Sequence, residues 1–172
     1  MDDLRYAGVD FCDTANGEGV GVVLFTQGCS HHCQGCHNPE TWDFKKGKPF
    51  TNDTLLALEK HWKKPFIKRF TLSGGDPFDN LQLSMFLAAR FKGVHLHKKL
   101  WIYTGYTFKQ ILDNDDFRNS MLLSLADVIV DGPFDIKQKD LSLAFRGSSN
   151  QRLIDVQKSL EMEEAVLYKL NV

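Results

Sequence analysis

Four short runs of apolar, β-branched and aromatic residues, separated by segments with helical periodicity, constrain the fold of this chain most strongly. Each run has the length and composition of a buried strand. The four predicted strands are Val20–Thr26, Ile67–Leu72, Leu100–Thr104 and Val128–Val130. Strands that alternate with helices form βαβ units, and such units build a mainly parallel sheet. The pattern therefore predicts an α/β fold.

The segments between these runs predict helices. Thr51–Trp62 begins with Thr, Asn and Asp, which cap helix N-termini, and continues with leucines at helical spacing. Asn80–Phe91 carries two apolar stripes, and we expect this helix to end before Gly93. Two shorter helices are predicted at Phe108–Leu112 and Ser120–Ala126.

The length of 172 residues suits one domain, and no repeat or linker divides the chain, so we expect a single domain over residues 1–172. About four to six strands are too few for a closed eight-stranded barrel, which typically takes about 250 residues. We therefore expect an open, partial β/α barrel. Ligands of such sheets bind at the carboxyl ends of the strands, where we expect the functional site.

The charge balance argues against a nucleic-acid-binding protein, because the net charge is −1 and such proteins usually carry a strong basic excess. No apolar stretch approaches the ~18 residues of a membrane-spanning helix. The N-terminus lacks the basic start and apolar run of a signal peptide. We therefore expect a cytoplasmic protein without a nucleic-acid or membrane partner. In that reducing compartment, clustered cysteines are more often metal ligands or redox groups than disulfides.

Three of the four cysteines lie in one loop directly after the first predicted strand. Cys29, Cys33 and Cys36 follow the spacing C-x3-C-x2-C. Three thiolates suit a [4Fe–4S] cluster with one iron left open. A structural zinc ion is the alternative, with a histidine of the same loop as its fourth ligand. The histidines of this loop are His31, His32 and His37. Cys12, upstream of the strand, could serve as a fourth ligand, but we expect it to be a buried free cysteine that packs as a small hydrophobe.

A glycine-rich turn follows the second predicted strand. Gly74 and Gly75 lack a Cβ atom, so a ligand could approach their backbone groups closely. Asp76 adds a negative charge that suits an ammonium group. Alone, this is an ordinary turn. Because the carboxyl ends of neighbouring parallel strands meet at one edge, we expect it beside the cysteine loop, where a zinc site would have no need of it.

The cysteine spacing together with the segment Ser73–Pro77 (SGGDP) resembles the radical S-adenosylmethionine superfamily. Further segments narrow the resemblance to the glycyl-radical activases known as anaerobic ribonucleoside-triphosphate reductase activating proteins. These segments are Asn16–Gly19 (NGEG), His37–Trp42 (HNPETW), Trp101–Tyr106 (WIYTGY), Val130–Phe134 (VDGPF) and Arg146–Gln151 (RGSSNQ). The resemblance spans Leu4 to Asp155. Residues 156–172 form an unmatched tail, in which Ala165–Leu170 is either an added strand or a loose end.

The resemblance implies one [4Fe–4S] cluster per chain, held by Cys29, Cys33 and Cys36, with S-adenosylmethionine bound at the open iron. The reduced cluster would cleave S-adenosylmethionine to methionine and a 5′-deoxyadenosyl radical. That radical would take a hydrogen atom from a glycine on the large subunit of anaerobic ribonucleoside-triphosphate reductase. A flavodoxin- or ferredoxin-type protein would donate the electron. Since the cofactors carry this chemistry, no catalytic acid–base residue is expected.

The resemblance also implies which residues contact S-adenosylmethionine. They are Gly35, Cys36, His37, Gly74, Gly75 and Asp76. Tyr103–Gly105 would either border the same pocket or simply end a core strand. Arg146–Gln151 would contact either the methionine carboxylate or the partner.

Two residues depart from the pattern of the superfamily. His37 stands where Tyr or Phe is usual, and Asp76 stands where many members have Glu. An imidazole can stack on adenine but also bind a metal, which keeps a zinc-binding interaction module open as an alternative. Another alternative is a small-molecule enzyme similar to the deazaguanine synthases, which would not be expected to carry Arg146–Gln151.

Overall fold

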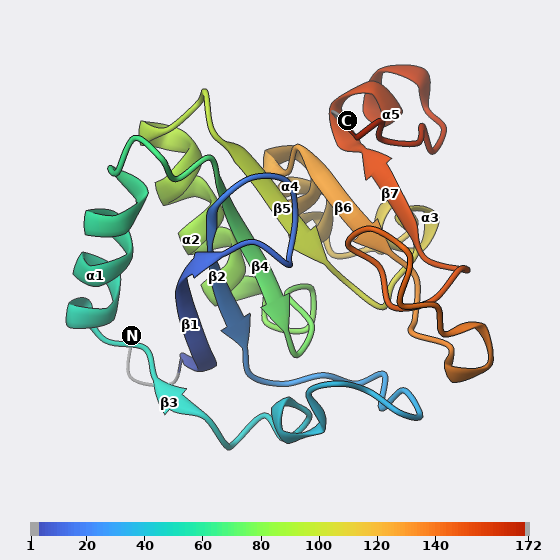
Figure 1. Cartoon of the computed structure of the whole chain (residues 1–172), viewed down its shortest axis with the longest axis horizontal. Helices are drawn as coiled ribbons and strands as arrows, with labels where there is room; N and C mark the ends of the chain where they lie inside the picture. Colours follow the sequence, from blue (N-terminus) through green and yellow to red (C-terminus); the bar gives the residue numbers. More distant parts are fainter. Residues whose placement is uncertain (1–3, 171–172) are drawn as a thin grey trace.

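The computed structural model describes residues 4–170 and is organised around an open seven-stranded sheet (Figure 1). The strand order is β3-β1-β2-β4-β5-β6-β7. The strands are β1 (Arg5–Asp13), β2 (Gly21–Thr26), β3 (Lys48–Pro49), β4 (Arg69–Gly74), β5 (Lys99–Tyr103), β6 (Val128–Asp131) and β7 (Arg152–Asp155). Strands β2, β4, β5 and β6 run parallel, and the flanking strands pair antiparallel. The expected α/β class and the open sheet are confirmed.

The four predicted strands are β2, β4, β5 and β6, but the expected total of four to six strands was wrong for residues 4–170. Strand β1 is mostly half-exposed, and its register shifts between Tyr6 and Gly8 and again between Asp10 and Asp13. These irregularities remove the strict alternation by which a strand is recognised. Strand β3 escaped prediction because it is only two residues long and exposed. Strand β7 escaped because only its two central residues, Leu153 and Ile154, are apolar and buried.

All four predicted helices are present; Phe108–Leu112 has its predicted bounds, and the other three begin or end at a different residue. The helices are α1 (Asn52–Trp62), α2 (Leu81–Val94), α3 (Phe108–Leu112), α4 (Phe117–Leu125) and α5 (Val156–Met162). Thr51 caps α1, as predicted, by accepting a hydrogen bond from the Thr54 backbone N–H. Helix α2 continues through Gly93, so its predicted end was wrong. Helix α4 starts earlier than predicted because Asp116 caps it. Within residues 4–170, no helix has the length and apolar composition needed to cross a bilayer.

The two faces of the sheet bury different clusters. Leu100 and Ile102 of β5 belong to the large core under the helices, whereas Trp101 between them faces the other way. Figure 1 shows α2 and α4 behind the central strands in this view. Trp101 joins a smaller cluster with Val128, Val130 and Leu153. The helices therefore cover one face, and loops and the C-terminal tail cover the other.

The segment Ala165–Leu170 is neither a loose end nor a regular strand. It makes an isolated antiparallel bridge to β7, in which the Tyr168 backbone N–H donates to the Leu153 carbonyl at 2.8 Å. The Tyr168 ring packs edge-on against Trp101 with centroids 5.6 Å apart, and its hydroxyl donates to a Glu18 carboxylate oxygen at 2.6 Å. The tail thus closes the smaller cluster.

Candidate functional site

The cysteine loop and the glycine turn meet at the carboxyl ends of β2 and β4, as the sequence predicted. Thr26 pairs with Gly74 at the ends of these parallel strands, which lie side by side in Figure 1. The backbone N–H of Gly75 donates to the Thr26 carbonyl at 2.9 Å, and that of Asp76 donates to the Gly28 carbonyl at 2.8 Å. The two segments therefore form one continuous surface.

The absence of a side chain at Gly75 is required by this contact. A Cβ atom there would lie 2.3 Å from the Gly28 carbonyl oxygen, which is a backbone atom. Gly74 has φ = +92°, and a Cβ atom there would lie 2.6 Å from the Cβ atom of Phe25. Both glycines allow the chain to approach itself closely, a reason that the sequence alone did not reveal.

The cysteine loop is closed at its base by backbone hydrogen bonds. The N–H of Gly28 donates to the Thr41 carbonyl at 2.7 Å, and the N–H of Cys29 donates to the Trp42 carbonyl at 3.2 Å. Cys29 is buried at this base. The other two cysteines of the loop, Cys33 and Cys36, are half-buried and free of disulfides. The three predicted thiols therefore lie in one loop whose base is fixed by backbone hydrogen bonds.

Burial makes two of these thiols, Cys29 and Cys33, hard to ionise. It raises the pKa of Cys29 to about 11, and the carboxylates of Asp76 and Asp79 act in the same direction. Burial also raises the pKa of Cys33, and the neighbouring Cys36 adds to this. A metal centre binds thiolates, so binding one here would have to release protons from the loop.

The donor set of this loop consists of three free thiols. Within the described residues, no three Cys, His, Asp or Glu side chains lie close enough to hold one ion between them. A zinc site needs four ligands around one atom. A [4Fe–4S] cluster instead takes each thiolate on a different iron, so its ligands do not converge on one point. Three free thiols on a glycine-containing loop are compatible with such a cluster.

Asp76 is buried and binds three segments together. Its Oδ1 atom accepts from the Phe78 N–H at 2.9 Å, and its Oδ2 atom accepts from the Gly105 N–H at 2.8 Å. The Thr104 hydroxyl lies 3.0 and 2.9 Å from the two oxygens, and His31 Nε2 lies 2.9 Å from Oδ2. The hydrogen bond to Asp76 raises the pKa of His31, against the effect of burial. Asp76 therefore fixes the cysteine loop relative to the ends of β4 and β5.

The end of the cysteine loop lies against the segment that follows β6. The exposed His37 ring is 6.0 Å from the Phe134 ring, at an angle of 33° between their planes. A Cβ atom on Gly35 would lie 2.4 Å from Ile136 Cδ1. The predicted residues Gly35 and His37 therefore share a surface with this segment.

The segment Arg146–Gln151 is held by hydrogen bonds within itself and to the turn that follows β6. The Gln151 Oε1 atom accepts from the N–H groups of Gly147 at 2.9 Å and Ser148 at 3.2 Å, and Nε2 donates to the Gly132 carbonyl at 3.1 Å. The Asn150 side chain donates to the Pro133 carbonyl at 2.8 Å. The segments Val130–Phe134 and Arg146–Gln151, both part of the resemblance described above, thus pack on each other.

Cys12 was predicted to be a buried free cysteine. It is free but exposed, so the prediction of burial was wrong. Cys12 lies within the register shift of β1 between Asp10 and Asp13, where the alternation of faces is interrupted.

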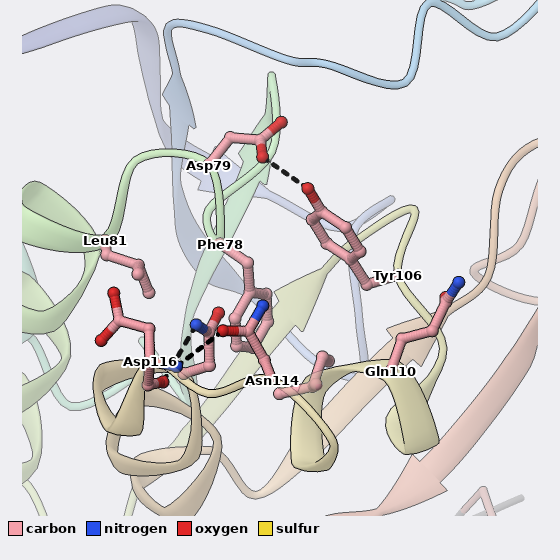
Figure 2. Close-up of a pocket in the computed structure, with 9 residues that line it drawn as sticks. Phe78, Asp79, Leu81, Tyr106, Gln110, Asn114 and Asp116 are labelled. Atoms are coloured by element: carbon pink, nitrogen blue, oxygen red, sulfur yellow. Dashed lines mark hydrogen bonds between the residues drawn. The ribbon is translucent and has the colours of Figure 1, made fainter.

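Sequence reasoning missed a hydrogen-bonded group at the cysteine loop that is made by Ser30, Asp79 and Tyr106. Asp79 accepts hydrogen bonds from the Ser30 backbone N–H at 2.6 Å, the Ser30 hydroxyl at 2.8 Å and the Tyr106 hydroxyl at 2.7 Å. Figure 2 shows the pair of Asp79 and Tyr106 at one end of a polar pocket that Asn114 and Asp116 line at the other end. Ser30, Asp79 and Tyr106 are 27 to 76 positions apart in the sequence, so no local spacing signals their hydrogen bonds.

The family described as the 4Fe-4S single cluster domain matches residues 15–154 of the chain. Several similar proteins carry the name anaerobic ribonucleoside-triphosphate reductase-activating protein. The one from Enterobacteria phage T4 is 38% identical over 152 residues, which cover 87% of this chain and 93% of the relative. Those from Pasteurella multocida (strain Pm70) and Escherichia coli (strain K12) are each 38% identical over 143 residues, which cover 81% of this chain and 89% and 90% of the relatives. The chain therefore belongs to the family of anaerobic ribonucleoside-triphosphate reductase-activating proteins.

Proposed function

We propose that this chain activates an anaerobic ribonucleoside-triphosphate reductase by generating a glycyl radical on its large subunit. The observation that carries the proposal is the contact between the three-cysteine loop and the Gly74–Asp76 turn at one edge of the sheet. The names of the relatives support it. We take residues 1–172 as one domain, a partial barrel of the radical S-adenosylmethionine type, whose open side would admit a loop of the partner.

Cys29, Cys33 and Cys36 would hold a [4Fe–4S] cluster and leave its fourth iron for S-adenosylmethionine. When both are bound, the cluster would supply the electron for reductive cleavage of S-adenosylmethionine, a chemistry that belongs to the cofactors. The chain supplies the thiolates and the surface that orients S-adenosylmethionine. We assign that surface to Gly35, Cys36, His37, Gly74, Gly75 and Asp76.

Within this surface, Asp76 and His37 have different roles in our proposal. Asp76 already accepts hydrogen bonds from its neighbours, so it acts by fixing the turn and by adding negative charge near an ammonium group. His37 is exposed and offers its ring for stacking on adenine. The thiols stay reduced in the cytoplasm, where we place the reaction with a flavodoxin- or ferredoxin-type electron donor.

The proposal is tested by anaerobic reconstitution with iron and sulfide, followed by addition of a reductant, S-adenosylmethionine and the co-expressed reductase. We expect a brown protein and a glycyl-radical EPR signal on the reductase, with methionine and 5′-deoxyadenosine as products. The matched control omits S-adenosylmethionine and should give no radical signal.

Two outcomes would contradict the proposal in different ways. Formation of 5′-deoxyadenosine without a glycyl radical would point to a small-molecule substrate. A colourless protein with one zinc ion per chain would remove the cluster altogether.

A further inference from the structure

Asp79 connects the cysteine loop to the segment that follows β5. Its Oδ2 atom accepts hydrogen bonds from both the backbone N–H and the hydroxyl of Ser30, at 2.6 and 2.8 Å. Its Oδ1 atom accepts from the Tyr106 hydroxyl at 2.7 Å. Ser30 directly follows Cys29, so the Asp79 carboxylate is hydrogen-bonded to the residue next to the first cysteine.

The surrounding contacts hold Asp79 and its partners in place. The Tyr106 backbone N–H donates to the Thr104 hydroxyl at 3.1 Å, and the Tyr106 ring packs edge-on against His31 with centroids 4.4 Å apart. His31 in turn contacts Asp76. Two successive residues of the loop, Ser30 and His31, are thus each held by a different aspartate of the turn after β4.

We propose that Asp79 is a positioning residue that fixes Cys29 for binding of the cluster. The inference rests on the proposed function, because the [4Fe–4S] cluster is the group for which Cys29 is held. Hydrogen bonds to a carboxylate are shorter and stronger than those between neutral groups, so Asp79 restrains Ser30 more firmly than a neutral side chain could. Groups that orient the ligands of a metal centre typically change metal affinity by about 10–100-fold when they are removed.

The test compares Asp79→Ala with Asp116→Ala. Asp116 lines the same pocket in Figure 2, but its carboxylate contacts Arg118 on its own helix and caps α4. After reconstitution, we expect Asp79→Ala to lose iron to a chelator about tenfold faster than the wild-type chain. Asp116→Ala should retain iron like the wild type even if its melting temperature falls.

Two further variants separate positioning from general stability. Asp79→Asn keeps an acceptor for Ser30 but loses the charge, so its rate of iron loss should lie between those of Asp79→Ala and the wild type. Tyr106→Phe leaves both bonds from Ser30 to Asp79 in place and should stay close to the wild type. In the cluster-free chain, the amide hydrogen of Ser30 should exchange faster in Asp79→Ala than in Asp116→Ala.

An unchanged rate of iron loss in Asp79→Ala, or an equal increase in Asp116→Ala, would overturn the inference. A wild-type chain that takes up zinc and no iron–sulfur cluster would overturn the proposed function instead. Exchange at Ser30 would then still decide whether Asp79 holds the loop.

Discussion

Cys33 lies half-buried in the loop after β2, whereas Cys12 is exposed on β1. Because three thiolates of the loop are proposed to hold the cluster, Cys33→Ala should abolish its binding. Cys12→Ala should leave about four irons per chain, as a single [4Fe–4S] cluster requires. Iron and sulfide analysis after anaerobic reconstitution measures the cluster content of both variants. If Cys12→Ala also lost the cluster, three-cysteine ligation would be wrong.

Single residues were predictable from the sequence where their chemistry is local. The spacing of Cys29, Cys33 and Cys36 placed three thiols in one loop, and in the structure all three are free cysteines of the loop after β2. The partners of Asp76 and Asp79 were not predictable in the same way. His31 and Thr104 come from opposite sides of the turn in the sequence, 45 and 28 positions from Asp76, and only the strand order brings them together.

At the scale of elements, the loop after β2 and the turn after β4 pack backbone to backbone, which predicts that Gly75→Ala separates them. The added Cβ atom would lie 2.3 Å from the Gly28 carbonyl oxygen, so backbone must move. We expect a loss of about 1–3 kcal/mol in the free energy of unfolding, the usual cost of overpacking. Urea denaturation of the cluster-free chain measures it.

Gly93→Ala is the matched control for this substitution. Gly93 lies inside α2, and a Cβ atom there would meet nothing within 4 Å. Alanine favours the helix over glycine by about 1 kcal/mol, so this variant should be as stable as the wild type or more stable. A Gly75→Ala chain that matched Gly93→Ala in stability would show that the two segments can separate without cost.

Elements were predicted best where they are buried and regular. Strands β2, β5 and β6 are almost wholly buried and read as near-continuous apolar runs, which parallel strands covered on both faces require. Strand β4 is buried as well, but its apolar residues Phe70 and Leu72 alternate with polar ones. Strand β1 lies nearer the edge, is half-exposed and shifts register. Its sequence therefore shows neither a continuous apolar run nor a strict alternation of apolar and polar residues. The end of α2 was misjudged because Gly93 is tolerated in an exposed last turn.

At the scale of the whole molecule, a buried ion pair joins the N-terminal strand to the centre of the sheet. Arg69 of β4 is fully buried, and its guanidinium donates to the carboxylate and to the carbonyl of Asp13 in β1. It also donates to the Thr71 hydroxyl at 2.8 Å, and that hydroxyl donates to the Asn16 carbonyl at 2.9 Å. One network therefore spans β1, the following loop and β4.

This pair predicts how the stability of the chain depends on pH. Burial by itself would raise the pKa of Asp13, but the hydrogen bonds from Arg69 and Asn16 outweigh it and hold the pKa below its ordinary value of 3.8. The unfolded chain therefore binds a proton at higher pH than the folded chain. The stabilisation is present above the ordinary pKa and is lost as the pH falls through the lower folded pKa.

Asp13→Asn should remove this part of the pH dependence and leave the Arg69 charge buried without its counterion. Breaking a buried pair in this way costs about 3–5 kcal/mol. Glu59→Gln is the control, because its partner Arg90 is exposed and such pairs contribute about 0–1 kcal/mol. Urea denaturation between pH 7 and pH 3 measures both variants. If Asp13→Asn lost stability on acidification as steeply as the wild type, the acid sensitivity would have to come from other carboxylates.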